Sequence, residues 1–448
     1  MNTITLNKLA IYTPTIDTLD STKVNQEINK NYYIDNYIHF SILMNNNNTI
    51  WKYGNLYLLY KIKEYHLPET TTIDSLLSNL KIFKEWIDTY DIQYLMSPTR
   101  KILGPIYQYR KHLNTLINEA KIKPATATNR MSTVISFYKF LVDIEGIYFQ
   151  YPLYEKKFTS FKYIDSLGFK NSKEVERTDV GYFKNTKAVD YKGESIKDGS
   201  NLIPIKLETQ EKLIKILIDS KNIEMRLGFF LALTTGARIQ SVFTLRLEHF
   251  KRIASDDENK VKIKIGDGTL CDTKRGKQHI LFVPKYIYNM IQIYIQSPRA
   301  KNRRNTSTHI FDNEDKYYLF LSNRGAPFYC AKNDPYRYLY NIQNNGNTVR
   351  QFIATTLKKE FKIHYNINYK HSFHDLRATY IMNIYDSKIE LVNKGIIKLS
   401  SLLHEMKEYA GHESIITTER YMDFRDRNKE TENIQNDYEN KLMIMITE

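Results

Sequence analysis

Three segments of the sequence place an arginine, a histidine or a tyrosine close to the predicted end of a helix. In the first, residues 233–241, a helix ends at Gly236 and Arg238 opens the next one. A guanidinium at such a boundary can reach a ligand and give parallel hydrogen bonds to phosphate oxygens. Taken alone, Arg238 is more simply explained as an exposed arginine that follows a glycine turn.

The second segment, residues 371–380, contains His374 and Arg377. At a spacing of three residues on a helix, these two side chains lie next to each other at the edge of an apolar stripe. They would converge on one ligand. The alternative for this segment is a partly buried histidine that is hydrogen-bonded to its neighbours.

The third segment, residues 409–422, contains His412 directly after Gly411, which ends a predicted helix. Tyr421 follows nine residues after His412 in a polar helix. The chain has 35 tyrosines, so any one of them is more often a packing residue than a reactive one. The distance from the Gly-His pair is what singles out Tyr421.

Together the three segments resemble the tyrosine recombinase family, also called phage-type integrases. That family has an arginine in a Thr-Gly-x-Arg turn, then His-x-x-Arg, then Gly-His nine residues before a tyrosine. The resemblance covers residues 205–425 strongly. It covers residues 69–145 more weakly, because that helical segment, whose last helix opens at 124–129, looks like the family's core-binding domain.

The family also uses a lysine in the turn of a β-hairpin that follows the first arginine. Lys274 occupies that place here, and Lys277 is the alternative because the length of the hairpin varies. The sequence departs from the family at Ser241, where an acidic residue often stands three positions after the arginine. This departure leaves open how Arg238 is held.

The resemblance implies strand cleavage by tyrosine attack on a phosphodiester, with a 3′-phosphotyrosyl intermediate. Two arginines and a second histidine would neutralise the phosphate oxygens, His374 would serve as the base, and a lysine would protonate the leaving oxygen. No metal or nucleotide cofactor is expected, and the sequence has no Gly-x-x-x-x-Gly-Lys-Ser/Thr loop. The expected catalytic residues are Arg238, Lys274, His374, Arg377, His412 and the nucleophile Tyr421.

The composition agrees with a protein that acts on nucleic acid. Lys and Arg number 65 against 50 Asp and Glu, which gives a formal net charge of +15, and 42% of the residues are hydrophobic. The charge must lie on the surfaces of packed domains, where it attracts polyanions; DNA is favoured over an acidic membrane. Two cysteines without a Cys-x-x-Cys pair, and no signal peptide or apolar run of about 18 residues, predict a soluble, cytoplasmic, nucleoid-associated protein.

Hydrophobic periodicity predicts a mostly α protein with a small antiparallel β-sheet (α+β). Strand-like runs at Val261–Ile265 and Gln278–Pro284 flank a basic turn. Five regions are expected: 1–68, unassigned and open to an accessory DNA-binding role; 69–145, a helical core-binding domain with three amphipathic helices; 146–204, a linker or insertion; 205–430, the catalytic domain; and 431–448, a C-terminal tail. Helices in the catalytic domain are expected around 207–217, 223–233, 286–295, 349–361, 374–384 and 402–409.

The expected partners are double-stranded DNA with specific recombination sites and three further copies of the chain. The family exchanges strands in a tetramer through a Holliday junction, and the resemblance implies the same here, for a mobile genetic element. The apolar stretch Leu442–Ile446 is expected to dock on a neighbouring protomer, and a directionality or accessory factor stays open. The alternatives are a telomere resolvase, a type IB topoisomerase-like enzyme, or a catalytically silent DNA-binding protein of the same fold.

Overall fold

The chain divides into two compact units, Met1–Ala188 and Val189–Glu448, which are described separately. The predicted tail 431–448, with its apolar stretch 442–446, lies outside the described residues. Helices dominate both units and the sheets are two-stranded and antiparallel, so the predicted fold class is confirmed. Of the described helices, none combines the length and the apolar character needed to cross a bilayer. The computed structural model describes residues 2–12, 15–16, 24–25, 33–65, 70–164, 170–183, 195–307, 311–340 and 344–426.

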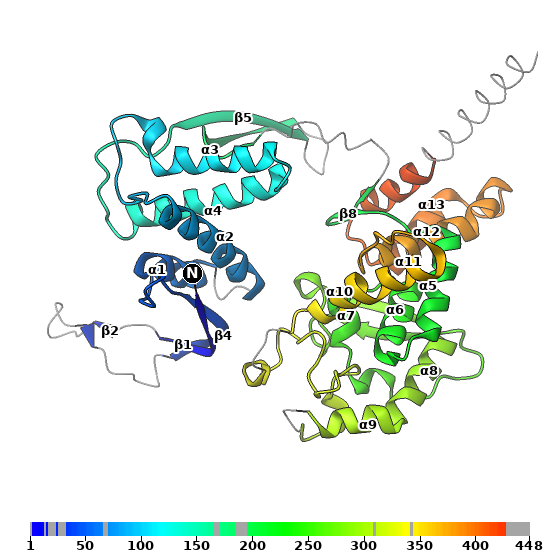
Figure 1. Ribbon diagram of the computed structural model, residues 1–448. Helices are drawn as coiled ribbons and strands as arrows, with labels where there is room; N and C mark the ends of the chain where they lie inside the picture. Colours follow the sequence, from blue (N-terminus) through cyan, green and yellow to red (C-terminus); the bar gives the residue numbers. More distant parts are fainter. Residues whose placement is uncertain are drawn as a thin grey trace, which may run out of the picture. The chain divides into compact units, whose positions relative to one another are not determined.

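Unit 1 is built on helices (Figure 1). They pack around an aromatic core. The three helices that the periodicity predicts within 69–145 are confirmed, and a further helix precedes them. Proline begins two of these helices, where its missing N–H costs nothing. The helices are α1 (Lys52–Glu64), α2 (Thr70–Thr89), α3 (Pro105–Asn118) and α4 (Pro124–Asp143).

The core of unit 1 centres on Phe83 of α2, whose side chain is fully buried. Its ring centroid lies 5.0 Å from that of Tyr109 and 6.0 Å from that of Trp86. The rings of Phe137 and Tyr138, on α4, lie at 6.5 Å and 6.2 Å. Three helices therefore meet on one ring, and this is the packing that the helical stripes predict.

Two-stranded antiparallel ribbons complete unit 1. The first lies within the segment that the sequence left unassigned, and its second strand contacts α1 and α2. The last ribbon follows α4 directly (Figure 1). The strands are β1 (Thr3–Tyr12) with β4 (Tyr33–Leu43), β2 (Thr15–Ile16) with β3 (Val24–Asn25), and β5 (Lys156–Ile164) with β6 (Lys170–Thr178).

Segment 146–204, expected to be a linker or insertion, contributes to both units. Val180 and Phe183 are buried in the core of unit 1, and Ile196 and Leu202 are buried in unit 2. These four residues therefore belong to packed cores and not to an extended linker. Single apolar residues between polar stretches leave no period for sequence reasoning to detect.

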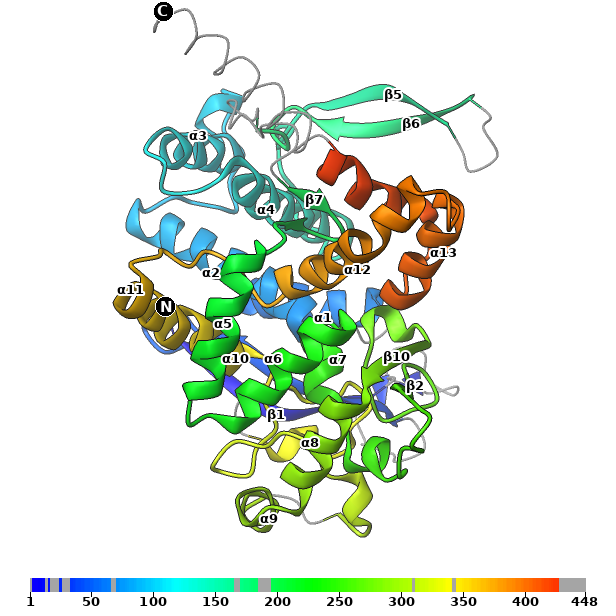
Figure 2. The ribbon, with the colours of Figure 1, turned by 90° about the vertical axis from the view of Figure 1, so that its right-hand side faces the viewer.

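Unit 2 is a helical body with two small hairpins (Figure 2). The hairpin predicted around the basic turn is confirmed, as are the predicted helices. Its helices are α5 (Leu207–Asp219), α6 (Ile223–Thr235), α7 (Ile239–Thr244), α8 (Lys285–Gln296), α9 (Pro298–Asn305), α10 (Asn347–Gln351), α11 (Lys358–Tyr365), α12 (Asp375–Asn393) and α13 (Leu399–Ala410), and residues 415–426 are also helical. Its strands are β7 (Ile196–Lys197) with β8 (Asn201–Leu202) and β9 (Lys260–Ile265) with β10 (His279–Pro284).

Helix α6 is the central element of unit 2, in contact with α5, α7, α8, α12 and β10. Most of its side chains are buried, as expected for a helix that is apolar on nearly all sides. Strand β9 alternates exposed and buried residues, so Val261, Ile263 and Ile265 face the same core. This packing fixes the end of α6 and the β9–β10 turn, both of which carry predicted site residues.

We expect Phe83→Ala to lower the free energy of unfolding of unit 1 by about 3–5 kcal/mol, because the surrounding rings cannot collapse onto the cavity. Urea unfolding followed by tryptophan fluorescence would measure this loss, since Trp86 packs on Phe83. Tyr148→Ala is the control, because Tyr148 is 85% exposed and its removal should change stability by no more than about 0.5 kcal/mol. Equal effects of the two substitutions would contradict the packing described.

Candidate active site

Gly236 ends α6 in the left-handed conformation, with a φ of 67°. A Cβ at this position would lie 2.6 Å from the ring of Tyr380 on α12, so a larger residue would require a shift of the packed ring. The chain therefore turns sharply, and Arg238 becomes the residue that precedes α7. The Arg238 side chain is 27% exposed.

The start of α12 is fixed by the buried carboxylate of Asp375. It accepts hydrogen bonds from the backbone N–H of Ile203 at 2.7 Å and of Ser372 at 2.6 Å, and from the hydroxyl of Ser372 at 2.8 Å. A negative charge at the N-terminus of a helix is also favourable to the helix dipole. His374 and Arg377 are positioned by this turn.

Gly411 ends α13, again in the left-handed conformation, with a φ of 64°. A Cβ there would lie 2.8 Å from the ring of His279 on β10. The close approach of backbone and ring directs the chain into the turn that contains His412. The helix at 415–426 follows and carries Tyr421.

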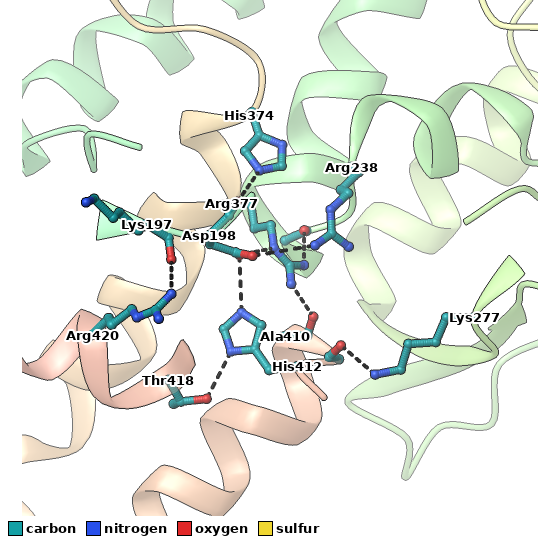
Figure 3. A network of polar contacts seen from close by, with 12 residues as sticks. Lys197, Asp198, Arg238, Lys277, His374, Arg377, Ala410, His412, Thr418 and Arg420 are labelled. Atoms are coloured by element: carbon teal, nitrogen blue, oxygen red, sulfur yellow. Dashed lines mark hydrogen bonds and ion pairs between the residues drawn. The ribbon is translucent and has the colours of Figure 1, made fainter. Parts of the chain in front are cut away.

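Asp198, in the turn between β7 and β8, lies at the centre of these residues (Figure 3). Its Oδ2 accepts hydrogen bonds from Nε of Arg377 at 3.0 Å, from Nε2 of His412 at 3.3 Å and from the hydroxyl of Tyr421 at 3.1 Å. Its Oδ1 forms an ion pair with Nη2 of Arg238 at 3.7 Å. One carboxylate thus joins groups from three separate segments of the chain.

Arg377 is buried, and its remaining N–H groups donate hydrogen bonds to backbone carbonyls at the ends of two helices. Nη1 donates to the carbonyl of Gly236 at 3.1 Å and Nη2 to the carbonyl of Ala410 at 2.7 Å. The last carbonyls of a helix carry a partial negative charge and lack partners within the helix. Arg377 therefore ties the end of α6 to the end of α13.

Hydrogen bonds position the side chains of both histidines. His374 Nε2 lies 3.3 Å from the backbone oxygen of Asp198, and because a carbonyl only accepts, this nitrogen carries a proton. His412 Nδ1 lies 2.9 Å from the hydroxyl of Thr418. The ring of His412 stacks on that of Tyr421, with the centroids 5.6 Å apart.

A cavity of about 250 Å³ lies beside Asp198. Its wall includes Arg238, Arg377 and His412, together with two lysines of the β9–β10 turn. A water molecule occupies about 30 Å³ of liquid, so the cavity has room for a phosphate group. Tyr421 does not line this cavity and is fully buried.

The two lysines of the turn have different surroundings. Lys277 Nζ donates to the backbone oxygen of Gly411 at 3.1 Å (Figure 3). Lys274 Nζ lies against the β7–β8 turn, 3.1 Å from the place of a Cβ on Gly199. Among the residues the structure describes, Lys274 Nζ has no hydrogen bond or ion pair, whereas Lys277 is committed to the backbone.

The charges in the site change the pKa values of its groups. Burial raises the pKa of Asp198, but the hydrogen bond from His412 and the charge of Arg377 outweigh burial and hold that pKa well below its usual range. Burial, with the nearby charge of Asp198, raises the pKa of Tyr421. Burial and Arg377 lower the pKa of Arg238 to about 10, so Arg238 remains charged at neutral pH.

Burial lowers the pKa of both His374 and His412 below the ordinary value of 6.5. For His374, the charges of Arg238 and Arg377 act in the same direction. For His412, the hydrogen bond to Asp198 opposes the effect in part. Both imidazoles are therefore neutral at pH 7, and Nδ1 of His374 can accept a proton.

The predicted residues come together as the sequence indicates, and Asp198 is the residue that sequence reasoning missed. It lies within the segment expected to be a linker, where only the Asp-Gly-Ser turn between Ile196 and Leu202 could have drawn attention to it. Its ion pair with Arg238 shows how that arginine is held although Ser241 is not acidic. The residues gathered around Asp198 or its cavity are Arg238, Lys274, Lys277, His374, Arg377, His412 and Tyr421.

The site is built to hold an anion. Within the described part of the chain, no group of three or more His, Cys, Asp or Glu is placed to hold a metal ion. The carboxylate of Asp198 is shared by Arg377, His412 and Tyr421. The donors around it are guanidinium, ammonium and imidazole groups, which bind phosphate or carboxylate.

Comparison with family models and with curated sequences finds no match. Solved structures similar to this chain include XerH site-specific recombinase bound to difH substrate in a post-cleavage complex (11% identity, TM-score 0.45, 82% of this chain and 80% of that one). A Tn1549 transposon integrase in complex with transposon right end DNA has 14% identity and a TM-score of 0.45, over 85% of this chain and 98% of that one. A lambda integrase dimer bound to a COC′ core site has 14% identity and a TM-score of 0.45, over 84% and 96%.

We expect Arg238→Gln to raise the pKa of His374, because the charge of Arg238 now disfavours the imidazolium. NMR titration of histidine side chains in the full chain would measure this change. Arg324→Gln is the control, since Arg324 is exposed on a turn outside the site. An unchanged pKa of His374 in the Arg238 variant would show that the two groups are not neighbours in solution.

Proposed function

We propose that this protein is a tyrosine-type site-specific DNA recombinase, an integrase that cleaves and rejoins DNA for a mobile genetic element. The observation that supports the proposal is the convergence of a phenol, two guanidinium groups and two imidazoles on one point beside a basic cavity. Cations fixed around a phenol favour the phenolate, and they also stabilise the charge that grows on a phosphate under attack. This set of groups supports phosphoryl transfer to tyrosine.

In the cleavage step, the hydroxyl oxygen of Tyr421 attacks the scissile phosphorus. The new bond joins this oxygen to phosphorus, and the bond from phosphorus to the 5′ oxygen breaks. His374 takes the phenolic proton through Nδ1, and Lys274 supplies a proton to the leaving 5′ oxygen. Arg238 and Arg377 hold the non-bridging oxygens, where bidentate guanidinium groups match the geometry of phosphate.

In the joining step, a 5′ hydroxyl attacks the phosphotyrosyl bond and releases Tyr421. The energy of the phosphodiester is kept in the covalent intermediate, so joining to a second duplex consumes no nucleotide. The proton transfers run in reverse, with the lysine as base and the histidine as acid. In this proposal the whole reaction is carried by side chains of the protein.

We propose that four protomers act on two duplexes in the cytoplasm, at the nucleoid, and exchange strands through a Holliday junction. The net charge of +15 supports a large phosphate contact, so DNA binding should weaken steeply as salt rises. A directionality or accessory factor would add a further partner. The DNA site must be read by contacts outside the cluster around Asp198, since phosphate contacts carry no direct sequence information.

We expect the protein to form a covalent adduct with a nicked duplex from its own genomic neighbourhood, in the presence of EDTA. The nick traps the intermediate, because the cleaved fragment diffuses away before rejoining. Gel electrophoresis after denaturation would show the adduct, and Tyr421→Phe should abolish it while DNA binding persists. Salt-sensitive binding without an adduct would contradict a recombinase and favour a silent DNA-binding protein.

We expect Lys274→Ala to slow single-turnover cleavage by about 10²- to 10⁴-fold, the usual contribution of a positioned acid. A substrate with sulfur in place of the scissile 5′ oxygen should restore the rate, because a thiolate leaves without a proton. Lys277→Ala is the matched variant from the same turn, and its defect should not be restored by sulfur. The reverse pattern would assign the proton to Lys277.

A further inference from the structure

The β7–β8 turn touches every residue that the proposed reaction uses. The side chain of Asp198 contacts Arg238, Arg377, His412 and Tyr421, and its backbone oxygen accepts from His374. Lys274 lies beside Gly199, the next residue of the turn. A carboxylate is therefore at the point where the reacting groups converge.

The donors that hold Asp198 are the donors that a phosphate requires. The guanidinium groups of Arg238 and Arg377 pair with its oxygens, and Nε2 of His412 donates to Oδ2. The other nitrogen of His412 is already paired with Thr418, so no ring nitrogen of His412 is left for a second anion. Carboxylate and phosphate accept the same forked hydrogen bonds.

We propose that Asp198 stands in for the scissile phosphate before DNA binds, and that the phosphate displaces it from these donors. The inference rests on the proposed function and extends it by naming which group the substrate replaces. Two anions cannot share one set of donors a few ångströms apart in a partly buried site, because their repulsion is poorly screened. Displacement of the carboxylate therefore accompanies entry of the phosphate.

The nucleophile is held back by the same contact. Tyr421 is fully buried, and its hydroxyl donates a hydrogen bond to Asp198. The negative charge of Asp198 opposes formation of the phenolate. Arg420, the residue before Tyr421, donates to the backbone oxygen of Lys197 at 3.0 Å (Figure 3). The β7–β8 turn is thus attached both to the hydroxyl of Tyr421 and to the helix that carries it, so release of the turn also releases the nucleophile.

In the transition state, the phosphate binds the shared donors more strongly than the carboxylate does. Charge on the phosphate oxygens increases as Tyr421 attacks, whereas the charge of Asp198 is constant. The turn that carries Asp198 is closed by only two residue pairs of the β7–β8 hairpin, so Asp198 can shift while Ile196 and Leu202 stay packed in the core. Asp198 can therefore order the cationic side chains before binding and still be displaced by the substrate.

The test compares Asp198→Asn with Glu211→Gln in the full-length protein. Glu211 is exposed on α5 and does not line the cavity, so its variant removes an equal charge from the same unit without changing the site. Asp198→Asn should form the adduct on the nicked duplex about tenfold faster or more, because a larger fraction of the protein can accept the phosphate. Glu211→Gln should behave as the unmodified protein, and a slower or unchanged rate for Asp198→Asn would overturn the proposal.

Binding of inorganic phosphate separates this inference from the proposed function. Calorimetric titration should show tighter phosphate binding by Asp198→Asn than by the unmodified protein or by Glu211→Gln. Tighter phosphate binding by Asp198→Asn supports the role of Asp198 as a stand-in for phosphate even if no variant forms an adduct. The absence of an adduct would refute only the proposed recombinase function. Equal phosphate binding by all three proteins would overturn the stand-in.

A second measurement avoids dependence on the folding of Asp198→Asn. Hydrogen exchange of residues 196–202 can be followed in Tyr421→Phe, which keeps Asp198 and cannot react. Addition of the duplex that gives the adduct should speed exchange in this hairpin, because Asp198 leaves its donors. Unchanged protection of the hairpin in the presence of the duplex would also overturn the proposal.

Discussion

The ion pairs of one buried carboxylate organise the candidate active site. Two guanidinium groups brought close together repel each other and lose hydration, and an anion between them offsets both costs. Asp198 supplies that anion for Arg238 and Arg377, and accepts from His412 at the same time. The rest of the site depends on this contact, since without it two cations would face each other in a partly buried cluster.

The carboxylate can play this part only because its hairpin is anchored on both sides. Ile196 and Leu202 are buried among residues of α12 and α13, and the N–H of Ile205 donates to the hydroxyl of Thr379 on α12. Arg377 on the same helix then links the ends of α6 and α13. The glycine that ends each of these helices lets its last carbonyl approach the guanidinium. Hydrophobic packing, the glycine caps of the two helices and the ion pairs therefore all hold Asp198 in the same position.

In a site organised in this way, the cationic side chains are in place before a substrate binds, but the site is not yet reactive. The cations are ordered by an internal anion, so the entropy of placing them is lost during folding and not during the reaction. Burial and the charge of the same anion raise the pKa of Tyr421, so the proposed nucleophile stays protonated while Asp198 holds it. Exchange of one anion for another is then enough to convert the resting cluster into a reacting one.

The sequence by itself determined the helices and the β9–β10 hairpin, and it predicted the candidate residues of the site. Helical periods and glycine stops are local, and the motifs around Arg238, His374 and His412 keep their spacing along the chain. Only the tertiary structure decided the role of Asp198, which is 214 residues from His412 and 223 from Tyr421 in sequence. Its hairpin has too few apolar residues for a detectable period, and a pairing of charges across such a distance leaves no trace in local spacing. The physical reason is that periodicity records which face of an element is buried, whereas the partner of a buried charge is chosen by the fold.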